Sequence, residues 1–98
     1  MTVEDVIKFS KPHRNQIPGA RQTRICDDRI EVSIVGGAKG LYGDFSEDFE
    51  IAVFDKSSNE FITRFFFPDN YDDVVPYLSG DKMIEFLNET FKKGFQVR

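Results

Sequence analysis

Two segments of the chain alternate apolar and polar residues, and this period of two constrains the fold more than any other feature. The segments span residues 29–35 and 49–55. The residues that share a face are Ile30, Val32 and Ile34 in the first segment and Phe49, Ile51 and Val53 in the second. Successive side chains of a β-strand point to opposite faces of the sheet. Both segments therefore predict strands that turn one face toward a core.

Two further segments are predicted to extend this sheet. Residues 20–26 precede the first alternating segment, and the polar pair Asp27 and Asp28 between them favours a tight hairpin turn. Residues 60–67 are rich in the phenylalanine and β-branched residues that strands favour. This last strand must end at Pro68, because proline has no amide hydrogen to donate to the sheet. The sequence therefore predicts a four-stranded antiparallel meander.

A helix is predicted toward each end of the chain. Thr2 can cap a short helix over residues 3–9, and Ser79 can cap a longer one over residues 80–93. Gly94 stands where a left-handed residue often terminates a helix. Apolar residues recur at helical spacing in the second helix; they are Met83, Ile84, Leu87 and Phe91. The predicted fold is α+β, with the longer C-terminal helix packed on one face of the meander.

The size and composition of the chain are those of one globular domain that spans residues 1–98. Hydrophobic residues make up 40% of the chain and charged residues 31%, which is an ordinary balance for a folded domain. No apolar run is long enough to cross a membrane, and the first residues lack the features of a secretory signal. A single cysteine fits a reducing compartment. These features predict a cytoplasmic protein without a membrane segment.

No catalytic constellation, metal site or cofactor is predicted. His13 is the only histidine and Cys26 the only cysteine, whereas metal binding and nucleophilic catalysis need several convergent groups. The acidic residues Asp69, Asp72 and Asp73 lack the spacing and the downstream glutamate of a calcium-binding loop, so a solvated loop is favoured. We therefore expect a protein that binds rather than one that catalyses.

A glycine-rich segment, residues 36–44, is the strongest candidate for a small-ligand site. Glycine allows positive φ, and successive amides in such a loop can converge on a phosphate group. The P-loop pattern is missing, so a plain connection between strands is the alternative. Pairing of the first two strands predicts that Arg21 lies closer than Arg24 to the loop. The residues assigned to this site are Arg21, Arg24, Gly36, Gly37, Lys39, Gly40, Tyr42 and Asp44.

Three short strings of residues in this region also form a recognisable pattern. They are residues 33–37 (SIVGG), 40–44 (GLYGD) and 49–54 (FEIAVF). The pattern resembles small uncharacterised proteins encoded by tailed bacteriophages and prophages, and the likeness extends to residues 72–74 and the final helix. The resemblance brings no assigned activity or catalytic residue. It implies a bacterial cytoplasm as the setting and, by analogy with other small phage proteins, a host or defence protein as the partner.

The aromatic content favours protein binding. Eleven of the 98 residues are phenylalanine, more aromatic surface than one small core readily hides. In the predicted strand 60–67, alternation turns Phe61, Phe65 and Phe67 toward the core together with Thr63. Phe66 points away from the core, as does Phe54 in the preceding strand. These two residues are the candidate protein-binding pair, to be covered by residues 3–9, by a partner, or by a second copy in a homodimer.

The distribution of charge argues against direct binding of nucleic acid. Residues 1–24 hold five basic and two acidic residues, whereas the rest of the chain holds eight basic and fifteen acidic ones. The sequence pI is about 4.9, and an acidic surface of this extent repels the phosphate backbone. Inhibitory or regulatory protein binding is therefore the leading hypothesis, and binding of a nucleotide or another phosphorylated molecule is the alternative.

Overall fold

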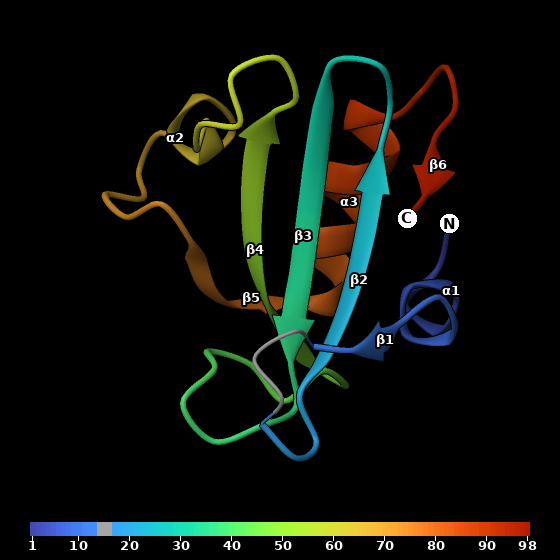
Figure 1. Cartoon of the computed structure of the whole chain (residues 1–98), viewed down its shortest axis with the longest axis vertical. Coiled ribbons are helices and arrows are strands. Elements are labelled where there is room, and N and C mark those ends of the chain that lie inside the picture. The colour runs from blue at the N-terminus through green and yellow to red at the C-terminus, as the bar shows by residue number, and fades with distance from the viewer. Residues whose placement is uncertain (14–16) are drawn as a thin grey trace.

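The computed structural model describes residues 1–13 and 17–98. In chain order the elements are α1 (Val3–Lys8), β1 (Lys11–Pro12), β2 (Arg21–Cys26), β3 (Ile30–Gly36), β4 (Asp48–Asp55), α2 (Thr63–Phe66), β5 (Val75–Ser79), α3 (Gly80–Thr90) and β6 (Gln96–Val97). Among the described residues, six strands form one antiparallel sheet accompanied by three short helices (Figure 1). The predicted α+β class is confirmed, whereas the predicted four-stranded meander is not.

The strands follow the order β1-β2-β3-β4-β5, and β6 also pairs with β2. Because β3 occupies one edge of β2, the short strands β1 and β6 share the other edge. The predicted hairpin between β2 and β3 is confirmed, with Cys26 opposite Glu31. Its turn is held by Asp27, whose carboxylate oxygen Oδ1 accepts hydrogen bonds from the amides of Arg29 at 2.8 Å and Ile30 at 2.9 Å. The aspartate pair is therefore a turn signal of its own, through a side chain that caps the backbone.

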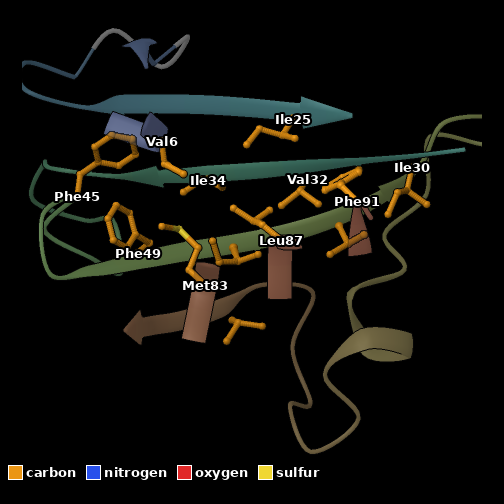
Figure 2. Close-up of a cluster of buried hydrophobic side chains, with 13 residues drawn as sticks. Val6, Ile25, Ile30, Val32, Ile34, Phe45, Phe49, Met83, Leu87 and Phe91 are labelled. Carbon is orange, nitrogen blue, oxygen red and sulfur yellow. The ribbon is translucent and has the colours of Figure 1, made fainter. Parts of the chain in front are cut away.

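The core lies on one face of the sheet, between the strands and the helices α1 and α3 (Figure 2). The predicted stripe on α3 is confirmed in its packing, because Met83, Leu87 and Phe91 are buried and Ile84 packs partly against the same cluster. The side chain of Ser79 accepts a hydrogen bond from the Lys82 amide and caps α3 as expected. The helix ends at Thr90 rather than at residue 93, because Phe91 leaves the helical conformation as its ring turns into the core.

The short helix α1 is fixed at its first turn by a reciprocal pair of side-chain bonds. The hydroxyl oxygen of Thr2 accepts from the Asp5 amide, and the Asp5 carboxylate accepts from the Thr2 amide. This capping box satisfies two amides that a helix leaves unpaired. Val6 then points into the core, where it is fully buried. The predicted start and cap of this helix are confirmed, and the helix ends at Lys8 rather than at residue 9. Of the alternatives for covering Phe54 and Phe66, the one by residues 3–9 does not hold, because Val6 packs in the core.

The fourth predicted strand is wrong. Only Phe61 makes an isolated bridge, to Phe54, and the chain then turns into α2. The cause is Thr63, whose buried hydroxyl group accepts from the Val53 amide at 2.9 Å and donates to the Asp73 carbonyl at 2.6 Å. These bonds draw residue 63 out of any regular ladder and tie it between two segments of the chain.

The place beside β4 is taken by β5, a strand that the alternation of apolar residues does not reveal. Its pairing with β4 shifts register at a bulge, and it contains Pro76 followed by Tyr77 with a positive φ of 52°. Proline and an irregular backbone are tolerated there because β5 is the edge strand. None of the described helices is long and apolar enough to cross a bilayer.

Candidate functional site

The glycine-rich segment forms the connection from β3 to β4. Gly37 adopts a φ of 88°, and a Cβ atom there would lie 2.7 Å from the carbonyl oxygen of Gly19. Asp44 closes the connection, because its Oδ1 atom accepts from the amides of Ser46, Glu47 and Asp48 at 2.8, 2.8 and 3.1 Å. These hydrogen bonds lower the pKa of Asp44. Gly37 and Asp44 therefore have clear architectural roles in a turn.

The cationic residues assigned to this site do not gather around it. Arg21 pairs with Gly36 and Arg24 with Ser33, so the prediction that Arg21 lies nearer the loop is confirmed. The Arg21 guanidinium, however, donates to the carbonyl and hydroxyl oxygens of Ser10 at 2.8 to 3.1 Å. Lys39 is exposed at the tip of the connection. The convergence of donors that an anion site requires is thus absent from these side chains in this conformation.

Tyr42, another member of that predicted set, lies at the edge of the sheet. Its ring meets that of Tyr77 edge-on, with 5.9 Å between the ring centroids, and its carbonyl oxygen accepts from the Tyr77 amide. The amide of Tyr42 donates to the Glu50 side chain at 3.2 Å. The loop therefore folds back over the β4–β5 edge and occupies an edge amide that another strand could otherwise use.

Arg24 belongs instead to an ion cluster on the open face of the sheet. Its Nη2 and Nε atoms lie 2.6 and 2.8 Å from Oε2 of Glu31, and Arg98 donates to Oε1 of the same carboxylate at 2.6 Å. Glu31 is only 6% exposed. Burial alone would raise the pKa of Glu31, but the bonds from the two arginines outweigh it and hold that pKa below its ordinary value. Sequence analysis did not single out Glu31, whose partner Arg98 is 67 residues away.

The lowered pKa of Glu31 predicts a pH-dependent contribution to stability. Above the ordinary value of 4.5 the contribution is complete, and it is lost as the pH falls through the lower value of the folded state. We therefore expect Glu31→Gln to lose less stability than the native chain between about pH 6 and about pH 3, measured as urea midpoints. Glu60→Gln, at an exposed site, should follow the native profile. Parallel profiles for the native chain and Glu31→Gln would contradict the role of this carboxylate.

The described residues that could bind a metal ion do not form a cluster. Cys26 is buried in β2, and no group of three or more histidine, cysteine, aspartate or glutamate side chains in residues 1–13 and 17–98 is placed to hold a metal ion. The residues Asp69, Asp72 and Asp73 lie exposed in the loop before β5. Asn70 organises that loop, since its side-chain amide donates to the carbonyls of Asp72 and Val74 at 2.9 Å.

Two exposed phenylalanines lie at and just before α2, beside the end of β4 (Figure 1). Phe65 is 85% exposed and Phe61 47% exposed. Both line a hollow of about 340 Å³, and we call the five residues that form it the aromatic ledge: Phe61, Ile62, Arg64, Phe65 and Asp73. Arg64 and Asp73 lie 4.0 Å apart as a loose ion pair on its rim. The ledge joins an apolar centre to a charged border, which is the arrangement of protein-binding surfaces.

The two phenylalanines predicted to share an outer face lie in different environments. Phe54 belongs to β4 and stacks on Phe61, with ring centroids 4.5 Å apart. Phe66 belongs to α2 and contacts Phe86 of α3 edge-on at 5.7 Å. The two predicted residues therefore have different roles: Phe54 contacts Phe61 of the ledge, and Phe66 links α2 to α3. Phe65 is the ring left outside, where the predicted strand had turned it inward.

Comparison with known proteins assigns no function to these surfaces, so their function must be inferred from the structure itself. No protein-family model, curated protein or solved structure matches the chain. Among the surfaces described above, the ledge combines exposed aromatic rings with a hollow. In the glycine segment and the ion cluster, by contrast, the polar groups form hydrogen bonds with other residues of the same chain.

Proposed function

We propose that the protein is a non-enzymatic binding module and that the aromatic ledge is its contact surface. The observation that carries this proposal is Phe65, a phenylalanine that leaves 85% of its surface in water. Burying one phenylalanine contributes roughly 1.5–3 kcal/mol. An exposed ring does not contribute this free energy to the stability of the free protein. Its burial in an interface would contribute it to the stability of a complex.

The backbone beneath the ledge supports this proposal because it is held firmly. Thr63 ties the start of α2 to β4 and to the Asp73 carbonyl, and Phe66 packs on Phe86 at the other end of the helix. A ring presented by a fixed backbone loses little conformational entropy on binding, which favours affinity. Phe65 thus has the properties of an interface anchor.

The edges of the sheet favour binding through side chains over addition of a strand. The outer edge of β2 is taken by β1 and β6, and β5 is interrupted by Pro76 and by the contact of Tyr77 with Tyr42. The partner we propose therefore places an apolar side chain in the hollow and opposes the charges of Arg64 and Asp73. The sequence resemblance is the ground for placing that partner among host or defence proteins of a bacterial cytoplasm.

Replacing the exposed ring tests the proposal. We expect Phe65→Ala to weaken capture of the partner about thirty-fold, which corresponds to about 2 kcal/mol for an interface anchor. The measurement is recovery of the partner from a bacterial lysate by the tagged chain, with quantitative mass spectrometry. Thermal unfolding should be unchanged within about 0.5 kcal/mol, because the ring makes no core contact.

The matched control is Tyr77→Ala, which removes another exposed ring, 62% exposed, at the β5 edge. It should capture the partner as the native chain does. Equal recovery by the native chain and Phe65→Ala would remove the ledge as the binding surface. Light scattering on the same three proteins tests the homodimer: a dimer that Phe65→Ala abolishes would identify a second copy as the partner.

A further inference from the structure

The short strand β6 is attached to the sheet by few contacts. It pairs with β2 at two positions, Ile25 with Val97 and Cys26 with Gln96. The Arg98 amide donates to the Arg24 carbonyl at 2.9 Å, and the Arg98 guanidinium donates to Glu31 at 2.6 Å. The last of these is a charge-assisted bond to a buried carboxylate, and such bonds are stronger than those between neutral groups. Arg98 is therefore the main fastening of β6.

The segment that leads into β6 makes few packing contacts with the rest of the protein. Among residues 91–98, all of them described, only Phe91 belongs to the core cluster or packs against it. Residues 92–98 are exposed, and Gly94 turns the chain with a φ of 120°. Two hollows, of about 580 and 400 Å³, are lined by this segment on one side and by Asp27 and Asp28 on the other. Such a sparsely packed segment can move without disturbing the core.

A buried thiol lies under this strand. Cys26 is 1% exposed, and strand pairing sets it between Gln96 of β6 and Glu31 of β3. Directly paired residues of neighbouring strands place their side chains on the same face of the sheet. The Gln96 side chain therefore lies next to the thiol on one side, and removal of β6 would expose it. The chain has no other cysteine, so modification of a thiol measures the accessibility of Cys26 alone.

We propose that β6 is a latch, which detaches from β2 by turning at residues 92–95 while the rest of the sheet stays folded. The bond from Arg98 to Glu31 sets the fraction of time for which the latch is closed. Opening frees the outer edge of β2 at Ile25 and Cys26 and leaves the backbone groups there without their partners in β6. This device lies at the edge of the sheet opposite α2 and is independent of the ledge (Figure 1).

Alkylation of Cys26 by iodoacetamide tests the latch in the folded, full-length chain. The thiolate displaces iodide and forms one carbon–sulfur bond after the thiol has lost its proton, and mass spectrometry counts the single adduct. Loss of a hydrogen bond between charged groups changes an opening equilibrium about ten-fold or more. We therefore expect Arg98→Ala to be alkylated about ten-fold faster than the native chain, and Arg98→Lys at an intermediate rate.

The control is Arg29→Ala, which removes an exposed arginine at the same end of the sheet, where its ion pair with Asp27 spans 3.9 Å. This variant should be alkylated at the native rate. Urea unfolding of each protein separates local opening from global unfolding. The proposal fails if Arg98→Ala reacts at the native rate, or if its faster reaction equals the rise in its global unfolding constant, since β6 would then unfold only with the whole sheet.

Discussion

Leu87→Ala should lower the free energy of unfolding by about 2–5 kcal/mol, the largest effect we expect from one side chain of α3. Leu87 is fully buried, and Met83 and Phe91 lie one turn away on either side in the same stripe (Figure 2). Its loss opens a cavity between α3 and the sheet. A domain of this size has roughly 5–15 kcal/mol of stability in total, so the loss would be a large fraction of it.

Urea denaturation followed by circular dichroism measures this effect. The matched control is Glu85→Ala, a substitution on the exposed side of the same helix, and its effect should stay within about 0.5 kcal/mol. A loss below about 1 kcal/mol for Leu87→Ala would mean that the helix does not depend on this residue for its contact with the sheet.

Gly37→Ala should be the second largest effect, a loss of about 3 kcal/mol that combines backbone strain with a steric clash. The φ of 88° is unfavourable for any residue with a Cβ atom, and the added carbon would lie 2.7 Å from the Gly19 carbonyl oxygen. Neither backbone segment can withdraw easily, because Gly19 precedes β2 and Gly37 directly follows β3. Thermal unfolding of the purified variant measures the loss.

Gly40→Ala separates the two causes. Gly40 has a φ of 96° in the same connection, but an added Cβ atom would have nothing within 4 Å. Only the backbone strain remains there, and we expect a loss of about 1 kcal/mol. Equal losses at the two glycines would show that the close approach to Gly19 is relieved by movement of the loop. A larger loss at Gly37 than at Gly40 supports an architectural reason for the glycine at position 37.

The sequence predicted only part of the candidate site. The excess of phenylalanine correctly indicated exposed aromatic side chains, but period-two alternation assigned Phe65, which is 85% exposed, to the core. The contrary signal was Thr63, a hydroxyl on the face that the prediction turned inward. A buried hydroxyl needs hydrogen-bond partners, and those it finds, in β4 and at Asp73, lie far enough along the chain to be invisible in a local pattern.

The ion cluster shows the same limit for charged residues. Arg24 stood out as a cation near a glycine-rich segment, and phosphate binding was a reasonable hypothesis for it. Its partner Glu31 follows from the register of the hairpin, but the second arginine, Arg98, directly follows β6 and is distant in sequence. Long-range pairing of this kind depends on how the strands are arranged around the core. Local spacing in the sequence does not predict that arrangement.

What the sequence determined by itself are the features held by neighbouring residues: the β2–β3 hairpin with its aspartate turn, the caps at Thr2 and Ser79, and the apolar stripe of α3. Each depends on residues a few positions apart, so composition and spacing suffice to predict them. Contacts between distant segments account for the departure of residues 60–67 from the sheet, for the place of β5 beside β4 despite its proline, and for the pairing of β6 with β2. In each case more than one segment could pair with the same edge of the sheet. Which segment does so depends on side chains such as Thr63 and Arg98, whose contacts form only when the chain is folded.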